Sequence, residues 1–179
     1  WQGNGPELPA KWFLTSTTDT NPPDPPPPDP EIWHLATSLH IYTGAIVSGT
    51  IGSTWMDDDV ELVLSETVGA PGFSYGIEFG EIQDVPDFNL SCHFKAWYSG
   101  NAGHNIKLQQ YNYVTDAFVN VTADPDDFPD ADSEQTYLFT LIADAAYLEN
   151  GHVLLRILHT SPGNVNHQFH IDELHLTLV

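Results

Sequence analysis

The side chains best suited to binding chemistry are three aromatic residues and one arginine. Trp97, Tyr111 and Tyr113 occupy strand positions opposite the expected core positions, where an aromatic ring can stack on a sugar ring. Arg156 is the sole arginine of the 179-residue chain, and its planar guanidinium suits a ligand hydroxyl or carboxylate. His104, beside a turn rich in Gly and Asn, is a further binding candidate. Alternatively, the aromatic residues fill a sheet face that the N-terminal arm or a partner subunit covers.

Arg156 also has a structural interpretation, which the sequence favours. It lies between Leu155 and Ile157 in an apolar strand, and a buried guanidinium needs a carboxylate partner. Asp172 lies on the following strand, which we expect to pair with the first as a hairpin. The sequence therefore predicts an Arg156–Asp172 pair that fixes the register of the two strands.

Two groups of side chains are candidate metal ligands. Asp57, Asp58 and Asp59, and the acidic loop 123–132, offer oxygen ligands for calcium, but neither has the Gly and Glu spacing of an EF-hand. His159 and His167 flank the turn 161–166 and are candidate ligands for zinc or nickel; if they meet across strands, they would instead make the domain sensitive to pH. Solvated loop acids remain the default interpretation, so we expect no required cofactor and leave a structural calcium as an alternative.

The sequence offers little support for catalysis. It contains no G-x-S-x-G elbow, H-E-x-x-H, P-loop or G-x-G-x-x-G motif. The single cysteine, Cys92, shares a strand face with Leu90 and Phe94, which predicts a small core residue and not a nucleophile. We therefore expect a protein that is not an enzyme.

The charge of the chain excludes two classes of partner. Twenty-five Asp and Glu face four Lys and Arg, which gives a formal net charge of −21. Nucleic acids and anionic membrane surfaces bind clusters of basic residues, and the four basic residues of this chain are too few and too far apart in the sequence to form a cluster. No apolar run reaches the roughly 18 residues of a membrane span, so we expect no membrane insertion.

Strands must position all of these residues. From residue 32 onward, apolar residues alternate with polar ones and turn signals recur about every ten residues, which predicts an all-β, two-sheet antiparallel jelly-roll sandwich. The Gly- and Asn-rich segments 99–105 and 161–166 indicate hairpins. Nine strands are expected, at residues 40–50, 60–66, 74–79, 89–98, 105–113, 118–121, 137–143, 152–160 and 167–179.

The N-terminal part has a different organisation from this sandwich domain (residues 32–179). Residues 22–31 contain PPDPPPPDP, which predicts a stiff polyproline linker because proline fixes φ and has no N–H to donate. Residues 1–21 form an extended arm whose apolar groups include Trp1, Trp12 and Phe13. These groups need a partner, which is the main domain, another subunit or a preceding domain, and the second option predicts a homo-oligomer.

Several short motifs in a fixed order carry a resemblance to a known family. They are Y-x-G-N-x-x-H (98–104), the Tyr111-Asn112 pair, Arg156 with His159, and His167 followed by Ile171-Asp172. Over about residues 40–179 the chain resembles a β-sandwich module of tailed-phage and prophage virion proteins, akin to galactose-binding and carbohydrate-binding domains.

This resemblance implies a non-enzymatic module associated with a virus particle. The first hypothesis is a virion structural or decoration protein that assembles with other virion subunits through its N-terminal arm. The alternative is an extracellular glycan-binding adhesin or carbohydrate-binding module that recognises a glycan on a host surface.

Overall fold

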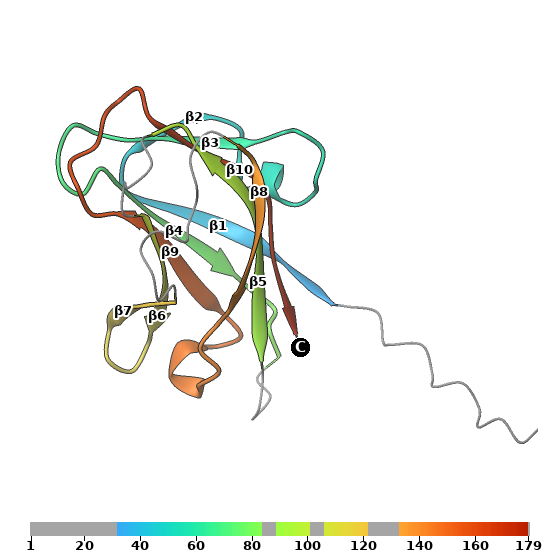
Figure 1. Ribbon diagram of the computed structural model, residues 1–179. Coiled ribbons are helices and arrows are strands. Elements are labelled where there is room, and N and C mark those ends of the chain that lie inside the picture. Colours follow the sequence, from blue (N-terminus) through green and yellow to red (C-terminus); the bar gives the residue numbers. More distant parts are fainter. Residues whose placement is uncertain (1–31, 84–88, 101–105, 122–132, 179) are drawn as a thin grey trace, which may run out of the picture. The chain divides into compact units, whose positions relative to one another are not determined.

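The computed structural model describes residues 32–83, 89–100, 106–121 and 133–178 (Figure 1). The predicted arm (1–21), the linker (22–31), His104 and the acidic loop 123–132 lie outside these residues. No helix in the described part of the chain is long and apolar enough to cross a membrane.

The described residues form strands, with two short 3-10 turns, η1 (Ile51–Thr54) and η3 (Ala145–Tyr147). Eight of the nine predicted strands are confirmed within a few residues. The predicted strand 40–50 is divided at Gly44 between the end of β1 and β2, and the structure adds the first half of β1, where WHLATSLH lacks a clear alternation. The strands are β1 (Trp33–Thr43), β2 (Ala45–Ser48), β3 (Leu62–Ser65), β4 (Phe73–Phe79), β5 (Leu90–Tyr98), β6 (Ile106–Asn112), β7 (Ala117–Asn120), β8 (Gln135–Thr140), β9 (Val153–His159) and β10 (Gln168–Leu178).

Two antiparallel sheets make up the predicted sandwich. The first, here called the β10 sheet, has the order β2-β3-β10-β5-β8. The second, the β4 sheet, has the order β1-β4-β9-β6-β7. Strand β1 joins the two, because residues 33–35 pair with β10 and residues 36–43 pair with β4. The two layers and the crossing strand are visible in Figure 1.

The two predicted hairpins are wrong. Segment 99–105 connects β5 to β6, and segment 161–166 connects β9 to β10, so each carries the chain from one sheet to the other. Gly and Asn permit a sharp reversal of the chain, but they do not determine which strand becomes the partner. Crossing connections of this kind are typical of sandwiches.

The core lies between the sheets and follows the alternation of the strands. On β5 the buried apolar residues are those predicted, and Cys92 is one of them; Ser91, on the opposite face of the strand, is buried as well. Burial raises the pKa of the Cys92 thiol, which agrees with a small core residue and not a thiolate nucleophile. The facing residues of β4 are buried as well, and together these two rows are Leu90, Cys92, Phe94, Ala96, Tyr98, Phe73, Tyr75, Ile77 and Phe79.

Candidate functional site

Polar and aromatic side chains gather on the outer face of the β4 sheet, away from the core. Each strand of this sheet contributes one residue to a row in register: His40, Gly76, Arg156, Gln109 and Asn120. Residues paired across adjacent strands point to the same side of a sheet, so this row brings together positions from five strands.

Arg156 begins a chain of hydrogen bonds along this row. Its Nε donates to Gln109 Oε1 at 2.7 Å, and Gln109 Nε2 donates to Asn120 Oδ1 at 2.8 Å. Among the described residues no carboxylate forms an ion pair with Arg156. Burial lowers the pKa of Arg156, while the Tyr42 phenol raises it. No described residue accepts a hydrogen bond from the Nη atoms of Arg156, so these N–H groups can donate to a ligand.

Aromatic rings border the guanidinium. Its central carbon lies 3.8 Å from the ring centroid of Phe118, which is cation–π geometry. The Phe118 ring lies 4.9 Å from that of Tyr111, and Tyr111 meets Tyr113 edge-on at 5.0 Å. Tyr42 approaches Phe118 edge-on at 6.5 Å and is 53% exposed. We call these four aromatic residues, together with Gly76, Gln109, Asn120 and Arg156, the aromatic face.

Gly76 allows Tyr42 to lie close to the sheet. A Cβ atom at position 76 would stand 3.0 Å from both Cε2 and the hydroxyl oxygen of Tyr42, and 3.3 Å from His40 Cβ. Such contacts are tighter than ordinary van der Waals packing, so any larger residue would push the Tyr42 ring away. The glycine therefore shapes the surface of the aromatic face.

A tight turn after β6 fixes the tyrosines at the edge of this face. Asn112 Oδ1 accepts hydrogen bonds from the backbone N–H groups of Val114 and Thr115 at 3.0 and 2.9 Å, and the Tyr111 hydroxyl donates to Asp116. That hydrogen bond, together with burial, raises the pKa of Tyr111, and burial raises the pKa of Tyr113 to about 12. Both phenols are therefore neutral at physiological pH.

Three predicted binding residues, Tyr111, Tyr113 and Arg156, meet on the aromatic face, and Trp97 does not. Trp97 lies on the outer face of the β10 sheet, where its ring stacks on His170 with centroids 3.7 Å apart. Its Nε1 donates to Glu61 Oε1 at 2.7 Å. Five further residues of the aromatic face were not predicted as binding residues from the sequence: Tyr42, Gly76, Gln109, Phe118 and Asn120. These residues lie on the same face of the sheet as Arg156 and Tyr111, and the period-two alternation of each strand indicates that face. The alternation alone does not show which strands are neighbours, so the strand order was needed as well.

The predicted Arg156–Asp172 pair is wrong. Asp172 accepts a hydrogen bond from Lys95 Nζ at 2.8 Å, and the same ammonium contacts Asp57 at 2.5 Å and Glu134 at 2.8 Å. The hydrogen bond to Asp172 is the largest of several contacts that raise the pKa of Lys95. Arg156 and Asp172 lie on strands of different sheets, so the expected hairpin pairing does not bring them together.

The calcium site at Asp57, Asp58 and Asp59 stays a prediction. Asp57 is paired with Lys95, and Asp58 Oδ1 accepts a hydrogen bond from the Val60 N–H at 3.1 Å. Asp59 has a left-handed backbone with φ of 62°. In the described part of the chain, no three His, Cys, Asp or Glu side chains are arranged to hold a metal ion.

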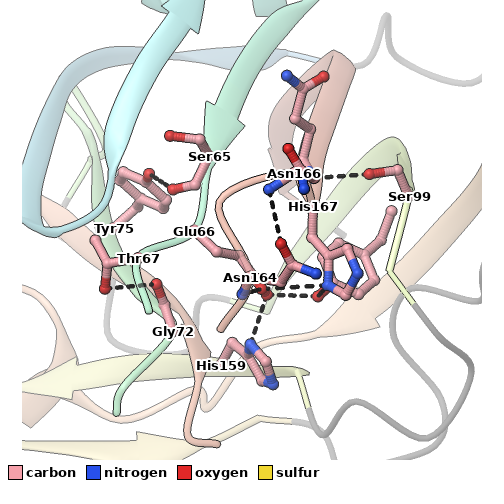
Figure 2. Close-up of polar contacts among 12 residues, drawn as sticks. Ser65, Glu66, Thr67, Gly72, Tyr75, Ser99, His159, Asn164, Asn166 and His167 are labelled. Atoms are coloured by element: carbon pink, nitrogen blue, oxygen red, sulfur yellow. Dashed lines mark hydrogen bonds and ion pairs between the residues drawn. The ribbon is translucent and has the colours of Figure 1, made fainter. Parts of the chain in front are cut away.

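His159 and His167 do come together, on the carboxylate of Glu66 (Figure 2). The Nδ1 atoms of the two histidines lie 2.6 and 3.4 Å from Glu66 oxygens, the Asn164 N–H donates to Oε2 at 2.6 Å, and the Tyr98 hydroxyl donates to Oε1. Burial alone would raise the pKa of Glu66, but the contacts from His159, Tyr98 and Asn164 lower it to about 2. We call these five residues the Glu66 cluster. It joins the segment after β3 to β9 and to the connection that precedes β10.

The comparisons with known proteins give structural neighbours only. No protein-family model and no curated protein sequence matches the chain. The enzymatically active domain of bacteriophage CBA120 tailspike protein 4 is similar over 79% of this chain and 19% of its own, with 13% identity and a TM-score of 0.47. The chain thus spans about a fifth of that structure.

Two further solved structures are similar over most of their own length. The xylan-binding module CBM15 is similar over 79% of this chain and 97% of its own, with 10% identity and a TM-score of 0.44. A Stig cyclase from Fischerella sp. TAU is similar over 87% of this chain and 92% of its own, with 11% identity and a TM-score of 0.38. At such identities and TM-scores, none of the three neighbours indicates a function for this chain.

Proposed function

We propose that this chain is a non-enzymatic glycan-binding module and that the aromatic face is its binding surface. The observation that carries this proposal is the environment of Arg156. In a chain with 25 acidic residues, its sole arginine forms no ion pair with a carboxylate among the described residues, and it lies against Phe118 with one edge hydrogen-bonded to Gln109.

The chemistry of the face suits a sugar. The rings of Tyr42, Tyr111 and Phe118 offer flat apolar surfaces on which the C–H groups of a pyranose can stack. Asn120 is exposed, and its side-chain amide can exchange hydrogen bonds with ring hydroxyls, while the buried Gln109 holds it in place. Aromatic surface and directional polar groups therefore occur together, as glycan recognition requires.

Arg156 indicates which glycans would bind best. A partly buried guanidinium gains most from a ligand group that supplies the missing negative charge, and a carboxylate can accept two parallel N–H donors. We therefore expect glycans with a uronic acid or another carboxylated sugar to bind more tightly than their neutral counterparts.

The other parts of the initial interpretation stay predictions. Lack of enzymatic activity rests on motifs missing from the sequence. Assembly and homo-oligomerisation through the N-terminal arm rest on residues 1–21, which lie outside the described residues. Incorporation into a virion and an extracellular location rest on the resemblance to phage virion modules.

A glycan array with the full chain, followed by calorimetry on each glycan that binds, tests the proposal. We expect binding of at least one acidic glycan, with an affinity that Arg156→Gln lowers at least tenfold and Tyr42→Ala lowers as well. Trp97→Phe, on the outer face of the other sheet, is the matched control and should leave the affinity unchanged. An array without any binding, or binding that is insensitive to Arg156 and Tyr42, would refute the proposal.

A further inference from the structure

A separate hollow of about 290 Å³ lies where β1 leaves the β10 sheet. The first residues of β1, the residue after η1 and the residues after β4 line it, and none of them belongs to the aromatic face. The lining residues are Trp33, His34, Leu35, Ala36, Thr37, Trp55, Gly80 and Glu81.

Two half-exposed indoles form walls of this hollow, and both are held in place. Trp33 is 50% exposed, and its ring stacks on His175 with centroids 4.1 Å apart and planes 12° apart. Trp55 is 42% exposed, and its Nε1 donates to the Ala36 carbonyl oxygen at 2.8 Å. A ligand would therefore meet rings whose positions are fixed before binding, which reduces the entropy lost on association.

The charge of the hollow is negative and uncompensated. Glu81 lines it without an ion-pair partner among the described residues, and no Lys or Arg contributes to the lining. Burial lowers the pKa of His34, although the Glu81 carboxylate raises it, so the neutral imidazole is favoured. At neutral pH, therefore, no cationic lining residue opposes a positive ligand.

We propose that this hollow binds a small organic cation that carries a quaternary or methylated ammonium group. Indole faces attract such groups through cation–π interactions, and a carboxylate at the same site adds direct charge attraction. The net charge of −21 raises the local concentration of cations at low ionic strength. The indoles would contact the methyl groups, and Glu81 would supply the counter-charge.

An uncharged sugar fits this hollow less well than the aromatic face. A sugar hydroxyl needs donors as well as acceptors, and two donors of the hollow are already used. Trp55 Nε1 donates to the Ala36 carbonyl, and the Thr37 hydroxyl donates to the Glu78 carbonyl at 3.0 Å. An ammonium group with methyl substituents requires only acceptors and aromatic surface.

The test uses a pair of probes that differ in charge and hardly in shape: choline and 3,3-dimethylbutan-1-ol. Titrations are followed through the indole N–H resonances of the full chain, with the Trp97 resonance as an internal control. We expect choline to shift the Trp33 and Trp55 resonances and the neutral alcohol to bind about fivefold more weakly.

Variants of the lining residues then show how much each of them contributes to choline binding. Trp33→Ala should abolish the response to choline, and Glu81→Gln should weaken it about threefold. Asp59→Asn is the matched control, because it removes the same charge from a residue outside the hollow and Asn tolerates its left-handed backbone; it should leave the affinity unchanged. Arg156→Gln should also have no effect, so this test is independent of the proposed glycan binding.

Three outcomes would overturn the proposal. Equal affinities for choline and the neutral alcohol would make the hollow a plain apolar site. Tighter binding of methyl glycosides than of choline would make it a sugar site. A dissociation constant of roughly 50 mM is the weakest that we expect from one pair of cation–π contacts. If 50 mM choline shifts neither the Trp33 nor the Trp55 resonance, the hollow binds no such cation.

Discussion

The Glu66 cluster and the aromatic face are both built from polar and aromatic side chains, but their hydrogen-bonding capacity is used differently. In the cluster, a buried carboxylate receives contacts from Tyr98, His159, His167 and the Asn164 N–H. On the aromatic face, Arg156 uses Nε for Gln109 and has no carboxylate among the described residues. A satisfied buried group stabilises the fold, whereas an unsatisfied group at the surface is available to a ligand.

The largest expected effect comes from breaking the cluster. Glu66→Gln should lower the free energy of unfolding by about 3 kcal/mol, because it removes a buried charge from its hydrogen-bonding partners. Chemical denaturation measures this effect. Glycan binding by the folded fraction should be unchanged, and a loss of glycan affinity without a loss of stability would reverse the roles of the two regions.

The same carboxylate should make the stability depend on acid pH. The fold lowers the pKa of Glu66 from its ordinary value of 4.5 to about 2. Its contribution is therefore fully present above about pH 4.5 and disappears as pH falls towards 2, and it amounts to at most about 3 kcal/mol. We expect the stability difference between wild type and Glu66→Gln that is measured at pH 5 to vanish near pH 2. A constant difference down to pH 2 would contradict this.

Arg156→Gln should lower glycan affinity and hardly change stability, which is the opposite of the effect expected for Glu66→Gln. We expect glycan affinity to fall by at least tenfold, since a charge-assisted contact contributes about 1.5–3 kcal/mol, while the free energy of unfolding changes by less than about 1 kcal/mol. Calorimetry and denaturation of the same preparation provide both values. Arg156→Lys should restore only part of the affinity, because lysine cannot form the planar bidentate contact.

The smallest effect is expected at Gly76. Gly76→Ala places a Cβ 3.0 Å from the Tyr42 ring, which must move outwards. We expect glycan affinity to fall by about two- to fivefold, in line with the loss of one aromatic contact of about 0.5–1 kcal/mol. Gly69→Ala, where an added Cβ meets no atom within 4 Å, is the control and should bind as wild type does. Equal affinities of all three proteins would show that Tyr42 does not contact the ligand.

The sequence predicted the strands but not their partners. Period-two alternation located the core face of β5, including Cys92, because one face of each strand must be buried. The pairing of Arg156 with Asp172 failed because the chain changes sheets between β9 and β10. Turn residues such as Gly163 report a change of direction and carry no information on the strand beside which the chain continues.

The candidate site was predictable in part for the same reason. Tyr111, Tyr113 and Arg156 could be selected from the sequence, since Arg156 is the sole arginine and the two tyrosines occupy strand positions opposite the expected core. Tyr42 and Asn120 could not, because their relation to Arg156 depends on the order β1-β4-β9-β6-β7. Trp97 had the right residue type, but it lies on the other sheet and is already bonded to Glu61.

The most direct test of the glycan-binding proposal is a map of backbone chemical-shift changes in the full chain during titration with the tightest-binding glycan from the array. We predict that the changed resonances belong to the second half of β1 and to β4, β6, β7 and β9, and that they are strongest around Arg156. Changes confined to β5 and β10, or spread evenly over both sheets, would contradict the assignment of binding to the aromatic face.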